Sequence, residues 1–211
     1  MNRLRYNRHQ AVEYLRKQCE PLGRFIDAHG RLELKVRREY DLFNALSRAI
    51  VYQQLSGKAA GTIHGRFAGL FEEEIPKAAQ AEAMSMEQLR SVGLSRNKAL
   101  AIQDLAEKTL DGSLPGMRRM ARMDDAQLIE NLCSVRGVGP WTAQMLLIFN
   151  LGRPDVMPAT DLGVQKGVQA VYRMRALPSP EQVVRKTRHL SPYRSAASWY
   201  FWRAADTELL T

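Results

Sequence analysis

The sequence predicts an all-α protein, and three observations carry that prediction. Apolar residues recur at helical spacing over most of the 211 residues, for example at Leu42, Leu46 and Ile50. Several segments begin with residues that are typical of helix N-termini. Only Arg31–Arg38 alternates apolar and polar residues as a strand does, and one strand cannot form a sheet. We therefore expect roughly nine or ten short helices joined by tight loops.

Periodicity alone indicates the helices of the N-terminal third. Their apolar residues fall on one face at a spacing of about 3.6 residues. In the segment Asp41–Leu55, Gln53 and Gln54 continue the helical spacing by one turn beyond the apolar residues. The expected helices are Arg8–Cys19, Asp41–Leu55 and Gly57–Phe71.

Capping residues indicate the later helix starts. A serine or aspartate three positions before a glutamine allows each side chain to bond the other residue's backbone N–H. Ser95 is expected to cap Arg96–Leu110. The capping pairs are Ser85 with Gln88, Asp124 with Gln127, and Ser179 with Gln182, the last of which encloses Pro180 at the first helical position. The remaining helices are expected at Asp124–Ser134, Pro140–Asn150, Asp161–Tyr172 and Pro192–Asp206.

Composition and charge narrow the class of function. The 31 Lys and Arg residues outnumber the 22 Asp and Glu residues, which favours an anionic partner, with nucleic acid first and acidic lipid second. The chain has no apolar run near the roughly 20 residues that span a bilayer, and its N-terminus lacks a secretory signal. Its two cysteines, Cys19 and Cys133, are too few for a four-thiolate metal site. We expect a cytoplasmic protein with no membrane partner.

The segment from 124 to 150 is typical of two helices joined by a tight turn. Gly137 and Gly139 in that turn permit backbone torsions and close approaches that a side chain would block. Their N–H groups, together with the positive end of the helix that starts at Pro140, make a site for an anion such as a DNA phosphate. From the spacing alone, an ordinary helix–turn–helix corner explains the two glycines equally well.

Three ordered motifs resemble a known family. They are Val135–Ala143 (VRGVGPWTA), Pro158–Asp161 (PATD) and Ala49–Ser56 (AIVYQQLS). With these motifs the chain resembles the helix–hairpin–helix superfamily of DNA glycosylases, and within it the 3-methyladenine DNA glycosylase II group, from about Asp41 to Trp202. Arg136 stands where many members have proline. The resemblance implies a single domain over residues 1–211 with the two-lobed helix–hairpin–helix glycosylase fold, a hairpin motif at about 124–150, and a cleft between the lobes for a flipped nucleotide.

Asp161 is the candidate catalytic residue. Taken alone, it is typical of a helix N-terminus, where a carboxylate complements the helix dipole. The resemblance instead implies that Asp161 is the catalytic aspartate that follows the hairpin. Because a purine alkylated at a ring nitrogen already carries a positive charge before it leaves, it departs with little acid assistance, and one carboxylate that stabilises the oxocarbenium-like sugar and orients water is sufficient. Asp155 is the nearest competitor and matches no catalytic position.

Three aromatic residues are candidates for the base pocket: Trp141, Trp202 and Tyr52. Bifunctional members of the superfamily carry a Schiff-base lysine two positions after the second hairpin glycine, and Trp141 occupies that position here. The resemblance therefore implies a monofunctional enzyme that leaves an intact abasic site. Trp141 is alternatively a core residue of the hairpin helix. In the C-terminal aromatic helix we expect Trp199 and Phe201 to lie in the core. The resemblance implies that Trp202 lies near Asp161 and stacks on the flipped base.

Gln54 and Leu55 are the candidate DNA-intercalating residues. An enzyme that extracts a nucleotide from a duplex must fill the gap that the nucleotide leaves. The resemblance implies that Gln54 fills this gap and that Leu55 wedges between bases. A helix end whose glutamines lie in solvent is the alternative interpretation.

The resemblance also bears on cofactors and on closely related branches. Branches with an iron–sulfur loop carry four cysteines after the catalytic aspartate, whereas no cysteine follows Cys133 here. Longer relatives carry a β-rich lobe before the helical core, and we expect the compact form without it. No redox cofactor or catalytic metal is expected. The family hairpin often binds a monovalent cation through backbone carbonyls, which here are those of Cys133, Val135 and Val138.

Together these observations predict a monomeric DNA glycosylase that hydrolytically excises alkylated purines such as 3-methyladenine from double-stranded DNA in base excision repair. A glycosylase for ethenoadenine or hypoxanthine would share every motif. A non-catalytic protein that binds DNA lesions would keep the hairpin and the intercalating residues, although the presence of Asp161 argues against it.

Overall fold

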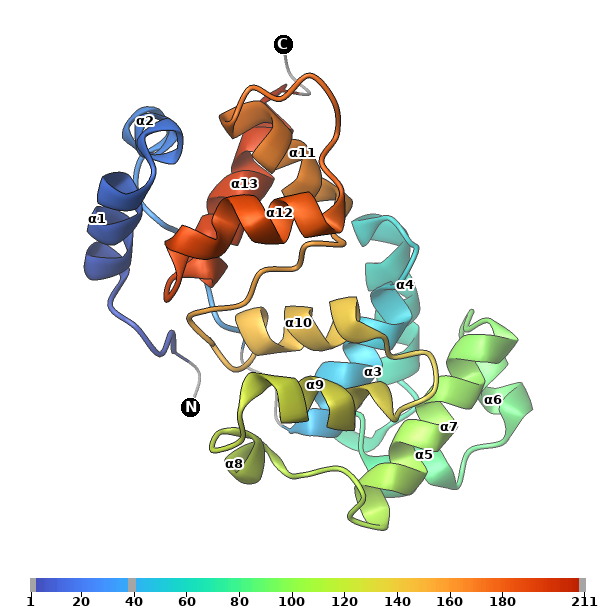
Figure 1. The fold of residues 1–211 in the computed structure, drawn as a ribbon. Helices are drawn as coiled ribbons and strands as arrows, with labels where there is room; N and C mark the ends of the chain where they lie inside the picture. Colours follow the sequence, from blue (N-terminus) through green and yellow to red (C-terminus); the bar gives the residue numbers. More distant parts are fainter. Residues whose placement is uncertain (1–2, 38–40, 209–211) are drawn as a thin grey trace. The chain divides into compact units, whose positions relative to one another are not determined.

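The computed structural model describes residues 3–37 and 41–208, and the regular secondary structure of these residues is helical (Figure 1). The all-α prediction is confirmed. The chain divides into two compact units, as the two-lobed prediction requires. Unit 1 contains the described residues 3–37 and 147–208, and unit 2 contains residues 41–146. None of the helices in these ranges is long and apolar enough to cross a membrane.

Unit 1 is built mainly from the two ends of the chain. The helices α11 and α13 pack so closely that a Cβ atom at Gly167 would lie 1.8 Å from the carbonyl oxygen of Phe201. Only glycine fits at this position, because any side chain would overlap the backbone of α13. The elements of this unit are α1 (Arg8–Gln18), α2 (Glu20–His29), α11 (Leu162–Val171), α12 (Pro180–Thr187), the 3₁₀ turn η2 (Arg188–Leu190) and α13 (Arg194–Glu208).

Unit 2 has its core around α3 and α7, which bury Phe43, Leu46, Ile102 and Leu105 almost completely. Its elements are α3 (Leu42–Tyr52), α4 (Gly57–Ala68), the 3₁₀ turn η1 (Glu72–Glu74), α5 (Ala78–Glu82), α6 (Met86–Ser91), α7 (Arg96–Leu110), α8 (Met117–Met120) and α9 (Asp125–Cys133). The helix α10 (Pro140–Phe149) contains the boundary between the units, which falls after Leu146.

Capping residues predicted helix starts well. The capping boxes at Ser85 and Ser179 are complete, with both reciprocal hydrogen bonds present. Asp124 caps α9 by accepting the N–H of Gln127. Ser95 caps α7, which begins and ends at the predicted residues. The sequence analysis did not predict the helices α2, α5 and α8.

The strand-like alternation at Arg31–Arg38 gives no strand over residues 31–37, in line with the all-α prediction, and Arg38 lies outside the described residues. The alternation nevertheless appears in the burial of the side chains, because Leu32 and Leu34 are buried while Glu33 between them is exposed. Apart from a bend at Arg31, residues 31–37 have no regular secondary structure. Arg8 donates a hydrogen bond to the carbonyl of Leu34 at 2.9 Å, which satisfies a backbone group without a strand partner.

Candidate functional site

Asp161 has a fixed carboxylate in unit 1. It is the N-cap of α11, and its Oδ1 accepts the N–H of Val164 at 2.8 Å. The same oxygen accepts the indole N–H of Trp202, also at 2.8 Å. Asp161 is therefore a helix cap, as its position alone suggested, but the cap is also held by a tryptophan from α13. Two donors that are themselves fixed in helices restrict both the position and the rotation of the carboxylate.

Trp202 is held in turn by its own neighbours. Its ring stacks on Phe149 with a centroid distance of 5.6 Å and an angle of 25° between the planes. Gly163 in α11 leaves room for the indole, because a Cβ atom there would lie 2.8 Å from its Cδ1. The structure thus places Trp202 beside Asp161. Its contact with a base remains a prediction.

Asp155 has a structural partner instead. Its carboxylate accepts hydrogen bonds from Arg194 Nε at 2.7 Å and Nη2 at 2.8 Å, and from the Ser191 hydroxyl at 2.8 Å. Burial raises the pKa of Asp155, but the hydrogen bonds and charge of Arg194 and the Ser191 bond outweigh burial and lower it overall. This carboxylate is engaged in holding the start of α13.

The hairpin turn lies in unit 2, between α9 and α10. Gly137 has a φ of +72°, a left-handed conformation that favours glycine, so the bend itself explains this residue. Gly139 is different, because a Cβ atom there would have no neighbour within 4 Å. Packing within the protein therefore does not require a glycine at 139. A ligand that approaches the backbone closely at this position would require one.

The three carbonyls predicted to hold a cation are those of Cys133, Val135 and Val138. The Val135 carbonyl accepts the N–H of Val138 at 3.0 Å, which closes the turn. A carbonyl oxygen has two lone pairs, so this bond is compatible with a cation on the same oxygen. Oxygen donors of this kind suit a hard monovalent cation, and the cation remains a prediction.

The prediction that a helix continues to Leu55 is wrong, because α3 ends at Tyr52. The ψ angle of Gln53 is 133°, which is not helical, and the φ angle of Gln54 is +56°, in the left-handed region. The reason lies far away in the sequence: Lys98 donates to the carbonyl of Gln53 at 2.9 Å, and the Gln53 side chain donates to the carbonyl of Gly137 at 3.0 Å. Gln54 and Leu55 are left exposed, Leu55 to 39%.

The aromatic candidates of unit 2 are also accessible. Trp141 is 41% exposed, so it is not a core residue. The Arg48 guanidinium lies 4.3 Å from the ring centroid of half-buried Tyr52, and the His64 ring lies edge-on at 6.0 Å. Burial, and then the charge of Arg48, lower the pKa of His64. The sequence analysis missed Arg48, although its position four residues before Tyr52 on one helix gave a usable signal.

The aromatic helix α13 divides into core and surface. Phe201 is fully buried, as predicted, and so is Tyr200. Trp199 is only half-buried and packs against His29 at 5.7 Å and against Tyr200 at 5.0 Å. The core assignment of Trp199 is therefore correct only in part.

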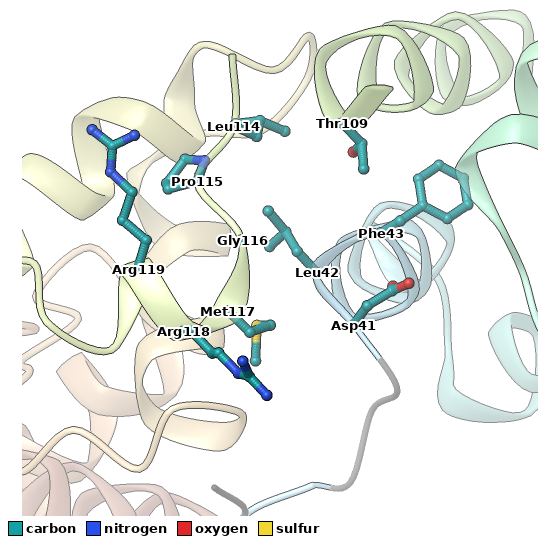
Figure 2. A pocket seen from close by; sticks show the side chains of 10 residues that line it. All are labelled: Asp41, Leu42, Phe43, Thr109, Leu114, Pro115, Gly116, Met117, Arg118 and Arg119. Carbon is teal, nitrogen blue, oxygen red and sulfur yellow. The ribbon is translucent and has the colours of Figure 1, made fainter. Parts of the chain in front are cut away.

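Unit 2 also contains a pocket of about 490 Å³, whose lining residues are shown in Figure 2. It is formed where the start of α3, the end of α7 and α8 meet. Apolar side chains including Leu42, Leu114 and Met117 line it, with Arg118 and Arg119 beside them. None of the predicted site residues is among its lining residues, so we do not assign it to base recognition.

Comparisons with known proteins identify the family to which the chain is similar. Residues 47–192 match the family model described as HhH-GPD superfamily base excision DNA repair protein. DNA-3-methyladenine glycosylase 1 of Schizosaccharomyces pombe is 35% identical over 164 residues, which cover 77% of this chain and 72% of that relative.

Two solved structures are also similar. The S. pombe 3-methyladenine DNA glycosylase (Mag1) in complex with abasic DNA has a TM-score of 0.85 and 33% identity, with coverage of 92% of this chain and 95% of that chain. The DNA-3-methyladenine glycosidase of Bacillus halodurans has a TM-score of 0.85 and 31% identity, with coverage of 95% and 91%.

Proposed function

Because this chain belongs to the HhH-GPD superfamily of base excision DNA repair proteins, we propose that it is a monofunctional DNA glycosylase that releases alkylated purines such as 3-methyladenine from double-stranded DNA. The observation that carries the proposal is the Asp161 carboxylate, fixed by the N–H of Val164 and the indole of Trp202. The names of its similar proteins support the choice of substrate. Residues 1–211 act in this proposal as one glycosylase domain with two helical units.

The proposed chemistry needs only a well-placed negative charge. An alkylated purine carries a positive charge, so the bond to the sugar breaks with little acid assistance. As it breaks, the sugar acquires oxocarbenium character, which the Asp161 carboxylate stabilises. The carboxylate also orients water for attack on the sugar, and the products are the free base and an abasic site. A carboxylate held before the reaction has no reorganisation to undergo during it.

The residues of unit 2 are proposed to bind the DNA. The backbone N–H groups of Gly137 and Gly139 face a phosphate, which the open space at Gly139 supports. Exposed Gln54 and Leu55 enter the duplex when the damaged nucleotide leaves it. Trp141 and Tyr52 of this unit are proposed to contact the flipped base, as is Trp202 of unit 1. The net charge of +9 favours association with the DNA backbone.

The absence of a lyase step follows from Trp141, which stands where a Schiff-base lysine would be needed. Treatment with borohydride during turnover should therefore trap no covalent protein–DNA adduct. A trapped adduct would contradict the monofunctional assignment. The proposal also includes action as a monomer in the cytoplasm, without a cofactor other than a monovalent cation at the carbonyls of Cys133, Val135 and Val138.

The experiment that tests the function uses duplexes that each carry one defined lesion, with abasic sites revealed by alkali. We expect strand breaks with alkylated purines and none with undamaged DNA. Strand breaks only in duplexes that carry ethenoadenine or hypoxanthine would show that the protein is a DNA glycosylase with a different substrate. Tight binding to lesion-bearing duplexes without any base release would instead indicate a non-catalytic lesion-binding protein.

A further inference from the structure

The helix α7 contacts both of the turns that the proposed function assigns to DNA. Its residue Lys98 donates hydrogen bonds to the carbonyls of Val51 at 2.7 Å and Gln53 at 2.9 Å, at the end of α3. Its residue Asp104 accepts the N–H of Arg136, in the hairpin turn, at 2.7 Å. One helix thus supports two turns that are far apart in the sequence.

Gln53 joins the same two turns directly. Its side-chain amide donates to the carbonyl of Gly137 at 3.0 Å and to the hydroxyl of Thr142 at 3.1 Å. Thr142 is buried, at 4% exposure, so its hydroxyl is a fixed acceptor on α10. The residue that follows α3 is therefore attached to the hairpin by its side chain and to α7 by its backbone.

These contacts account for the conformation of Gln54. A left-handed φ of +56° is uncommon for a residue with a side chain and persists where the surroundings impose it. Lys98 places a cation on the last carbonyls of α3, where such a charge is favourable, and its burial lowers its pKa. Ser56 then starts α4 by capping it. Both ends of the segment Gln53–Ser56 are fixed, while Gln54 and Leu55 between them are exposed.

We propose that Lys98 and Gln53 are positioning residues for extraction of the damaged nucleotide. They hold the segment Gln53–Ser56 against the hairpin, so that Gln54 and Leu55 enter the duplex at a fixed distance from the phosphate bound at Gly137 and Gly139. This inference rests on the proposed function. It assigns Lys98 and Gln53 a role in opening the duplex, before the bond to the base is broken.

The test separates extraction from bond cleavage. Lys98→Met and Gln53→Met remove the donors while keeping similar chain lengths, and Lys77→Met replaces an exposed lysine of the same unit as a control. Single-turnover release of an alkylated purine is measured from a fully paired duplex and from one in which the lesion faces an abasic gap. Extraction is easier in the second duplex because no pairing is broken.

We expect both variants to release the base roughly tenfold more slowly from the paired duplex, and less than about twofold more slowly from the gapped one. Lys98→Arg should restore part of the loss, because it keeps a charged donor. Equal losses on both duplexes would indicate a merely structural role and overturn the proposal, as would no loss at all. Thermal unfolding shows whether each variant folds. If one of the two does not, the release rates of the other variant test the proposal.

A second readout does not require base release. A fluorescent base analogue opposite an abasic-site analogue brightens when the duplex around it is unstacked. We expect the wild-type protein to brighten it on binding and the two variants to do so less. If the wild-type protein releases no base but unstacks the reporter, the proposed function fails and the positioning proposal stands. Binding without unstacking by the wild-type protein would overturn the positioning proposal.

Discussion

The candidate functional groups are held rigidly in unit 1 and exposed on turns and surfaces in unit 2. In unit 1 the Asp161 carboxylate is held by packed helices, and Gly167 lets α11 lie against the backbone of α13. In unit 2 the candidate groups lie on turns and surfaces, where Leu55 and Trp141 are exposed apolar side chains. A carboxylate that stabilises charge must keep its place, whereas groups that enter DNA must be accessible. The difference matches the proposed roles, in which rigidity serves the chemistry of unit 1 and exposure serves DNA recognition by unit 2.

The largest expected effect on stability tests the close packing of unit 1. Gly167→Ala places a Cβ atom against the carbonyl of Phe201, so the helices must separate, and we expect a loss of about 3 kcal/mol in the free energy of unfolding. Gly65→Ala is the control in unit 2, because its Cβ would meet nothing within 4 Å. It should be neutral or stabilising by up to about 1 kcal/mol. Chemical denaturation measures the free energy of unfolding of both variants. Equal losses would contradict the claim that close helix packing at Gly167 distinguishes unit 1.

Trp202→Phe tests whether the indole N–H holds the carboxylate. The variant keeps a ring to stack on Phe149 but loses the donor to Asp161. We expect base release in single turnover to slow by roughly ten- to a hundredfold, with little change in DNA affinity. Trp199→Phe, on the same helix, should leave the rate nearly unchanged. A wild-type rate in Trp202→Phe would show that the backbone cap alone positions Asp161.

Leu55→Ala tests the role of exposure in unit 2. Because Leu55 is 39% exposed, its truncation should cost little stability. We expect release from a paired duplex to slow by about tenfold, since the wedge between bases is lost. Leu110→Ala, which alters another leucine of unit 2 that is 47% exposed, should change neither property. Unchanged kinetics in Leu55→Ala would favour the alternative interpretation, in which this segment simply lies in solvent.

The smallest expected effect concerns Asp155, the carboxylate of unit 1 that is paired with Arg194. Since the fold lowers the pKa of Asp155, its ion pair with Arg194 contributes stability above the unfolded pKa of about 3.9 and loses it as the pH falls through the lower folded value. We expect Asp155→Asn to be less stable by about 1 kcal/mol at pH 7 and to approach the wild type as the pH falls below the unfolded pKa of about 3.9. Urea unfolding across this range measures it. A difference that persists in acid would contradict the assignment.

Local signals predicted much of the fold. The helix Arg96–Leu110 was predicted at both ends because Ser95 caps it and the turn at Gly112 follows it. The helix Glu20–His29 was missed because Cys19 alone separates it from α1, so the break carries no loop composition. The extent of α3 could not be predicted, since the Lys98 contact that ends it spans 45 residues of sequence.

The candidate site divides in the same way. The cap role of Asp161 is local and was evident from its position before a helix, whereas its bond to Trp202 joins residues 41 positions apart. Likewise, the left-handed Gln54 depends on side chains from α7 and α10, which a pattern along α3 does not contain. Local patterns thus predicted the helix cap at Asp161, and tertiary contacts determine how Asp161 and Gln54 are held.

The central claim, that Asp161 provides the charge that drives base release, is tested most directly by one rate. Randomly methylated DNA is incubated with excess protein, and released 3-methyladenine is followed by chromatography for the wild type, Asp161→Asn and the control Asp155→Asn. Asparagine still caps a helix, so Asp161→Asn should fold and bind DNA. We predict that its rate falls by roughly a thousandfold while Asp155→Asn stays near the wild type. Near-normal release by Asp161→Asn would contradict the account.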